Sequence, residues 1–290
     1  MQYQIRHLSA YHYSEAVSLC HSEACLLPRE LPWQRVEEAA LTVEPRAAFY
    51  RERRDFFGNR LQSFAIQDIH QTLAVRADSR VTIGLRPLDQ DSPSPPWEAV
   101  AEAVCRGENW RVCQFVLDSP FVKRDPALAD YARETFTPGR SLIEAVAELN
   151  RRIFEEFSYD PHFTTLATPL EVVLAERRGV CQDFAHLGLG CLRTLGLAAR
   201  YVSGYLETLP PAGQPRLEGA DASHAWLAVW VPGAGWAEFD PTNGLMPGSR
   251  HITLAWGRDY GDVAPLKGVT SGGGAHTLTV GVDVLPLGSG

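Results

Sequence analysis

The chain has 290 residues, 45% of them hydrophobic and 21% charged, a balance that excludes a mainly disordered protein and allows a sizeable core. Its length suggests about two domains. The net charge is -8, from 27 Lys and Arg against 35 Asp and Glu. An acidic chain without runs of Lys or Arg is poorly suited to bind nucleic acid or an anionic membrane through its overall charge, so neither partner is expected.

Targeting signals and common cofactor motifs are absent from the sequence. The first residues show no basic stretch followed by an apolar one, and no apolar run reaches the roughly 18 residues of a membrane helix. We therefore expect a cytoplasmic protein. No glycine-rich nucleotide-binding motif, acidic calcium loop or CxxC pair occurs, so no cofactor or metal is expected. Most of the six cysteines are expected to be buried and unpaired: Cys20, Cys25, Cys105, Cys113, Cys181 and Cys191.

Short strands dominate the first part of the chain. Apolar and polar residues alternate from Tyr3 to Tyr13, and further strand patterns recur between turn residues. The predicted strands after the first are residues 36–45, 49–54, 61–69 and 73–83, with a hairpin connection at 55–59. This pattern favours an antiparallel β-sandwich over residues 1–85. A stretch rich in Pro, Ser and Asp at residues 86–96 then predicts a linker.

From residue 97 onward, the apolar residues recur with the spacing of a helix, and strand patterns follow later. This combination predicts an α+β domain over residues 97–275. Ser141 and Glu144 form a capping-box pattern before a helix that ends near Phe157. Thr168 and Pro169 predict the start of a short helix that ends near residues 177–179. A third helix is expected from Cys181 to Leu195, stopped by Gly196. Alternating apolar residues at 276–290 predict a last strand that could rejoin a sheet, after a flexible glycine-rich loop at 271–274.

Cys181 is the strongest candidate for a chemical role. It opens an apolar helix, where the positive end of the helix dipole favours a thiolate, the nucleophilic form of cysteine. The alternative is a buried structural cysteine, the usual fate of a free thiol.

A predicted hairpin supplies partners for this thiol. Residues 222–231 and 236–240 read as two strands joined by a Pro-Gly turn. If the apolar faces of the two strands match, His224 and Asp240 project from the same side, where the carboxylate could orient the imidazole. The alternative is an edge histidine bound to a turn aspartate, and a β-bulge would break the parity. Trp226 and Trp230 share the His224 face and either line a cleft or are covered by the neighbouring domain.

Several sequence blocks resemble the transglutaminase-like superfamily. The blocks that match its core are residues 179–186, 195–205, 223–226 and 239–243. Residues 3–13 and 55–59 resemble the bacterial transglutaminase-like N-terminal region, and residues 257–265 resemble the tail of the same bacterial proteins. The resemblance implies a papain-like triad of Cys181, His224 and Asp240. It also implies a β-sandwich packed on an α+β cysteine-hydrolase core.

The resemblance does not choose the reaction, because the superfamily includes cross-linking transglutaminases, proteases and amidases. Our leading hypothesis is a cysteine hydrolase that acts on peptide or isopeptide amides through a thioester. The alternatives are transamidation to an amine acceptor and a binding module with an inactive triad. The backbone N–H of Cys181 is a candidate oxyanion donor, and Gln182 and Tyr159 are candidates for a second one. Asp183 is expected to pair with the backbone or an arginine.

Overall fold

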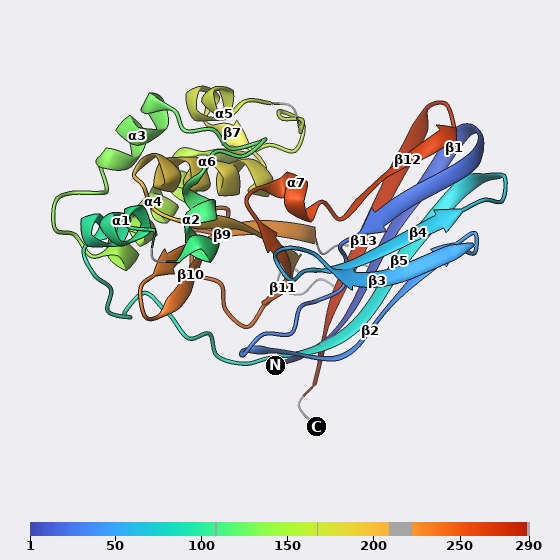
Figure 1. Ribbon diagram of the computed structural model, residues 1–290, viewed down its shortest axis with the longest axis horizontal. Helices are drawn as coiled ribbons and strands as arrows, with labels where there is room; N and C mark the ends of the chain where they lie inside the picture. Colours follow the sequence, from blue (N-terminus) through green and yellow to red (C-terminus); the bar gives the residue numbers. More distant parts are fainter. Residues whose placement is uncertain (108, 167, 209–221, 289–290) are drawn as a thin grey trace, which may run out of the picture.

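The computed structural model describes residues 1–107, 109–166, 168–208 and 222–288. Figure 1 shows two parts: a helix-rich half and, beside it, a long curled antiparallel sheet that holds both the first and the last strands of the chain. Between the two parts lies the short helix α7 (Tyr260–Val263). Among the described residues, no helix combines the length and the apolar character needed to cross a membrane.

The curled sheet is built around one very long strand, β1 (Gln2–Ala24). Its other N-terminal strands are β2 (Gln34–Glu44), β3 (Phe49–Arg54), β4 (Arg60–Ile66) and β5 (His70–Ile83), in the order β2-β5-β1-β4-β3. The predicted strands are therefore confirmed, including the β3–β4 hairpin. The sheet curls so that Phe64 and Ile66 of β4 join Leu73 and Val75 of β5 in one buried cluster. One continuous sheet thus encloses the apolar interior that the sequence predicted for a sandwich.

The C-terminal strands complete this sheet. β13 (His276–Leu287) pairs with the first half of β1, as the alternating tail predicted, and β12 (Leu266–Gly272) pairs with the second half. The segment 266–272, assigned from sequence to the core, is therefore a strand of the N-terminal sheet. The glycine-rich segment is a bulge between these two strands, where Gly272, Gly273 and Gly274 have positive φ and the backbone bonds to Ser14 and Glu15.

The helix-rich half surrounds a four-stranded antiparallel sheet of order β10-β9-β8-β11. Its strands are β8 (Ala199–Leu206), β9 (Ala222–Val231), β10 (Gly235–Phe239) and β11 (His251–Gly257). The helices are α1 (Trp97–Cys105), α2 (Trp110–Cys113), the 3-10 helix η1 (Gln114–Val116), α3 (Pro126–Arg133), α4 (Leu142–Glu156), α5 (Leu170–Glu176) and α6 (Cys181–Thr194). Two short strands, β6 (Ser158–Tyr159) and β7 (Arg178–Gly179), pair in parallel beside α6.

Helix α6 lies against one face of this sheet and is almost entirely buried. The contact is close because Gly188 faces Leu227 of β9, and a Cβ on that glycine would stand 2.3 Å from the leucine Cδ2. The helix ends at Thr194 and is followed by Gly196 at φ 80°, as predicted. Close packing on β9 places the first residue of α6 near the end of that strand.

The predicted start of α4 is confirmed, but the predicted capping bonds of Ser141 and Thr168 are not formed. Ser141 is the N-cap residue of α4 but its side chain makes no capping bond; the Ser94 hydroxyl accepts from the N–H of Ile143 instead, at 2.9 Å. The segment predicted as a linker therefore packs on the core and caps its helix. Helix α5 begins at Leu170, with Pro169 as its N-cap residue. The Thr168 hydroxyl does not cap this helix, because it accepts from the N–H of Thr165.

Candidate active site

Cys181 is held at the N-terminal end of α6 by the turn that precedes it. Asp183 Oδ2 accepts from the N–H of Val180 at 2.9 Å and from the hydroxyl of Thr164 at 2.6 Å. The turn requires glycine at 179, since a Cβ there would lie 2.9 Å from the Asp183 side chain. Burial raises the pKa of Asp183, while these two hydrogen bonds act in the opposite direction. The expectation that Asp183 binds the backbone is confirmed, and the result is a rigid support for a half-buried thiol.

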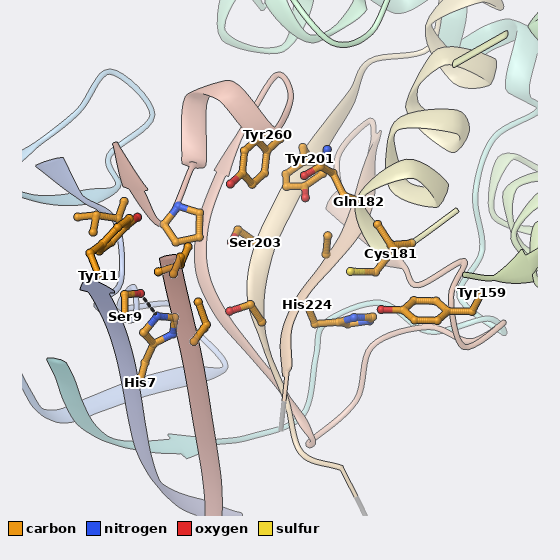
Figure 2. A pocket seen from close by; sticks show the side chains of 17 residues that line it. His7, Ser9, Tyr11, Tyr159, Cys181, Gln182, Tyr201, Ser203, His224 and Tyr260 are labelled. Atoms are coloured by element: carbon orange, nitrogen blue, oxygen red, sulfur yellow. Dashed lines mark hydrogen bonds between the residues drawn. The ribbon is translucent and has the colours of Figure 1, made fainter. Parts of the chain in front are cut away.

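His224 and Asp240 lie together as the parity of the hairpin predicted. In the β9–β10 register Trp230 pairs with Trp236 and Ala228 with Glu238, so even-numbered residues share a face. His224 Nε2 lies 2.7 Å from Asp240 Oδ2, and the aspartate is completely buried. Figure 2 shows the sulfur of Cys181 next to this imidazole, and the two side chains interact through a hydrogen bond. The imidazole therefore stands between the thiol and the buried carboxylate.

The buried carboxylate makes the imidazole a strong base. Burial alone lowers the pKa of His224, but its hydrogen bonds and charge interactions with Asp240 and Cys181 outweigh burial and raise the pKa to about 10. For Asp240, burial acts to raise the pKa, and its contacts with His224 and His251 outweigh burial and hold the pKa well below its usual range. Near neutral pH the pair therefore consists of an imidazolium and a carboxylate.

Two residues that fix Asp240 were missed by the sequence analysis. Asn243 Nδ2 donates to Asp240 Oδ2 at 2.7 Å, and His251 Nε2 lies 3.0 Å from the same oxygen. Burial lowers the pKa of His251, so its ring is neutral. The N–H of Gly248 donates to its Nδ1, which leaves the proton on Nε2. Asn243 belongs to residues 239–243, one of the sequence blocks that resemble the family, whereas no sequence pattern indicated a role for His251.

The thiol opens into a cavity of about 380 Å³ between the two halves of the molecule. The core contributes Tyr159, Gln182, Tyr201 and Tyr260, besides Cys181 and His224, and the curled sheet contributes His7, Ser9, Tyr11, Leu266, Leu278 and Val280 (Figure 2). Among the described residues that line it, none is Lys, Arg, Asp or Glu. Burial lowers the pKa of His7 to about 4, so this histidine is neutral as well. The N-terminal sheet thus forms one uncharged wall of the candidate site.

The remaining site candidates divide into two groups. Gln182 and Tyr159 line the cavity beside Cys181, and Tyr159 reaches this position through the β6–β7 pairing. Burial and the nearby Cys181 and Asp183 raise the pKa of Tyr159. Trp226 and Trp230 do not line this cavity. Trp226 is fully buried on the same face of β9 as His224, with the two ring centres 6.0 Å apart, and Gly204 leaves room for its ring; Trp230 borders a separate pocket.

Three buried side chains here could also approach a metal ion. The ligand atoms of His224, Asp240 and His251 lie within 4.8 Å of one another. Both imidazole Nε2 atoms, however, are directed at the same carboxylate oxygen as hydrogen-bond partners. A metal ligand nitrogen must be free of its proton, so a metal would have to replace both of these contacts. The expectation of no metal stays a prediction.

Comparison with known proteins identifies the family. Residues 129–241 match the transglutaminase-like superfamily, and residues 3–82 match the bacterial transglutaminase-like N-terminal region. An uncharacterized protein of Mycobacterium tuberculosis is 38% identical over 294 residues, which cover 99% of this chain and 93% of the relative. The chain belongs to the transglutaminase-like superfamily. An uncharacterized protein of Mycobacterium leprae is 31% identical over 285 residues, which cover 98% of each chain.

The transglutaminase-like fold also recurs in a solved structure. A candidate cysteine protease from Cytophaga hutchinsonii superposes with a TM-score of 0.80 at 22% identity, over 100% of this chain and 92% of its own. At this identity the likeness concerns the fold, which is a mixed α/β core joined to a curled antiparallel sheet. Family membership and fold support an enzyme of the cysteine-dependent hydrolase or transferase kind.

Proposed function

We propose that this transglutaminase-like protein is a cysteine-dependent amide hydrolase that cleaves peptide or isopeptide bonds through a thioester. One observation carries the proposal: Cys181 begins α6 beside His224, which lies 2.7 Å from the buried Asp240. An imidazolium held by a carboxylate stabilises an adjacent thiolate, and the helix dipole acts in the same direction. These three side chains would be the nucleophile, the acid–base group and the group that orients it.

The proposed reaction has two halves. The sulfur of Cys181 attacks the amide carbon, and the carbonyl electron pair moves onto oxygen. When this intermediate collapses, the C–N bond breaks and His224 gives its proton to the leaving amine. In the second half, neutral His224 takes a proton from water, and the hydroxide attacks the thioester. The C–S bond then breaks, which releases the acid and restores the thiolate and the imidazolium.

The developing oxyanion needs hydrogen-bond donors near the sulfur. The N–H of Cys181 is available because, in the first turn of a helix, backbone N–H groups have no acceptor within the helix. Gln182 and Tyr159 both line the cavity and can supply a second donor from a side chain. Burial raises the pKa of Tyr159, which keeps its hydroxyl protonated and able to donate.

The cavity favours an uncharged substrate segment. Its described lining has no acidic or permanently cationic side chain, and Leu278 and Val280 of β13 present partly exposed apolar surface to it. The polar side chains of this wall are His7, Ser9 and Tyr11, and the neutral His7 is hydrogen-bonded to Ser9 at 2.9 Å. We therefore expect the residue next to the scissile amide to be apolar or amidated, since a charged one would lose its hydration without a counterion.

Mass spectrometry of glutamine-containing and apolar peptides, incubated with and without an excess of a primary amine, tests the proposal. Free acid formed in both conditions supports hydrolysis, whereas an amine adduct supports transamidation. Cys181→Ala should abolish both products, and Cys105→Ala, which removes an exposed thiol elsewhere, should abolish neither. Product formation by Cys181→Ala at the rate of the unchanged protein would reject the proposed nucleophile.

A further inference from the structure

A second pocket lies on the face of the core sheet that is turned away from α6. Its volume is about 280 Å³. Arg200, Trp230 and Trp236 line it from the sheet, since Arg200 pairs with Ala228 in the β8–β9 register and so shares a face with both tryptophans. Aromatic residues of the β3–β4 turn and of α2 and η1 cover this face, among them Phe56, Trp110 and Phe115. The pocket is thus lined mainly by rings and is separate from the cavity beside Cys181.

Arg200 is a buried cation among the aromatic rings of this pocket. It is 4% exposed, and its guanidinium stacks on Trp236 at 4.2 Å and on Trp256 at 3.7 Å from the ring centres. In the described part of the chain, none of its side-chain N–H groups has a hydrogen-bond acceptor, and its Nε is fully buried. A buried cation normally needs a paired anion to offset its lost hydration, and stacking on aromatic faces offsets only part of that cost.

Among the described residues, no acid forms an ion pair with this guanidinium within 4 Å. Glu238 is the nearby acid whose charge Arg200 experiences. Its Oε2 is bound by Arg86 and by the indole of Trp226, whereas its buried Oε1 has no hydrogen-bond partner among the described residues and does not reach Arg200. A second guanidinium, Arg29, stacks on Trp256 at 3.4 Å and adds positive charge. Burial lowers the pKa of Arg200 to about 9, so it is still charged at neutral pH.

We propose that this pocket binds a carboxylate attached to an aromatic ring, with the carboxylate on the Arg200 guanidinium and the ring among the aromatic side chains. A guanidinium binds a carboxylate through two parallel hydrogen bonds, which would give Arg200 the acceptors it lacks. The volume lies just below the roughly 300–1,000 Å³ of drug-sized sites, so a ligand with one ring is expected. Phe56 and Trp110, which are 68% and 62% exposed, leave the mouth open to solvent.

Two sources share this chemistry: a free aromatic acid and a peptide whose last residue is aromatic. Isothermal titration calorimetry of the full chain distinguishes them, with phenylacetate and the peptide Gly-Gly-Phe as probes and their neutral amides as controls. Each acid that binds should do so at least about tenfold more tightly than its amide, because only the acid pairs with the guanidinium. Tighter binding of phenylacetate than of the peptide assigns a small molecule, and the reverse order assigns a peptide C-terminus.

Variants connect the binding to Arg200. Arg200→Met should weaken acid binding by about tenfold or more and remove the preference for acid over amide. Arg200→Lys, which keeps the charge but loses the paired donors, should weaken it less, and it replaces the first variant if that one does not fold. Arg124→Gln, an exposed arginine outside the pocket, should change nothing.

The site does not depend on the proposed hydrolase activity, so Cys181→Ala should bind the acids as the unchanged protein does. Equal affinity of acid and amide, no binding of either acid at millimolar concentration, or undiminished binding by Arg200→Met would overturn the proposal. Arg200 would then serve only as an internal counter-charge to Glu238.

Discussion

Replacement of Asp240 by Asn tests how the reactive thiol is activated, without knowledge of the substrate. The asparagine has nearly the same shape and can still accept from His224, but it removes the buried negative charge. Burial would then lower the pKa of His224 against less opposition. We expect the ring to lose its proton near neutral pH, so that Cys181 loses the cation beside it.

The size of the effect follows from the pKa of His224. A rise from 6.5 to about 10 corresponds to about 5 kcal/mol of preference for the charged ring, supplied by Asp240 and Cys181 against burial. If removal of the carboxylate costs even a third of this energy, the population of the ion pair between the imidazolium and the Cys181 thiolate falls by about tenfold. Because a less acidic thiol is also intrinsically more nucleophilic, the net reactivity at pH 6 should fall by about ten- to a hundredfold.

Alkylation by iodoacetamide at pH 6, followed by peptide mass spectrometry, measures this reactivity. The peptide that contains Cys181 should react about ten- to a hundredfold more slowly in Asp240→Asn than in the unchanged protein. Cys105 is exposed and does not line the cavity beside Cys181, so its rate in the same sample is an internal control. If Cys181 reacts equally fast in both proteins while Cys105 behaves normally, Asp240 does not sustain the ion pair.

Three further predictions follow from the contacts of these residues. Asn243→Ala removes a 2.7 Å hydrogen bond to Asp240 and should slow the same alkylation by about tenfold, whereas an unchanged rate would show that Asn243 does not position the carboxylate. Ser94→Ala should lower the free energy of unfolding by about 1 kcal/mol in urea denaturation, and Ser141→Ala by less, because the Ser94 hydroxyl caps α4; equal losses would contradict this assignment. The pKa of His224 is higher in the folded protein than in the unfolded chain, so its stabilising contribution is complete below about pH 6.5 and is lost as the pH rises through about 10. Calorimetry should therefore show a Tm that declines over this range, with a smaller decline in His224→Gln; equal declines would mean that His224 is not the titrating group.

The sequence predicted most of the local structure around the site because local patterns determine it. Alternating residues in β9 and β10 are enough to place His224 and Asp240 on one side of a hairpin, since side chains alternate along any strand. The start of α6 at Cys181 follows likewise from a periodic apolar helix that ends at glycine. The capping bonds expected of Ser141 and Thr168 were wrong, because a hydroxyl can bond to any nearby N–H and its choice depends on packing.

Contacts between distant segments could only be found in the folded chain. His251 reaches Asp240 from β11, Ser94 caps α4 from the connecting segment, and β12 and β13 return from the end of the chain to form a wall of the cavity. The stacking of Arg200 between two tryptophans is of the same kind. Sequence alone thus determined the candidate nucleophile and its histidine–aspartate partners, because periodicity and family resemblance are properties of the chain itself. The environment that charges the imidazole, closes the cavity and buries Arg200 among aromatic rings arises only when remote segments pack together.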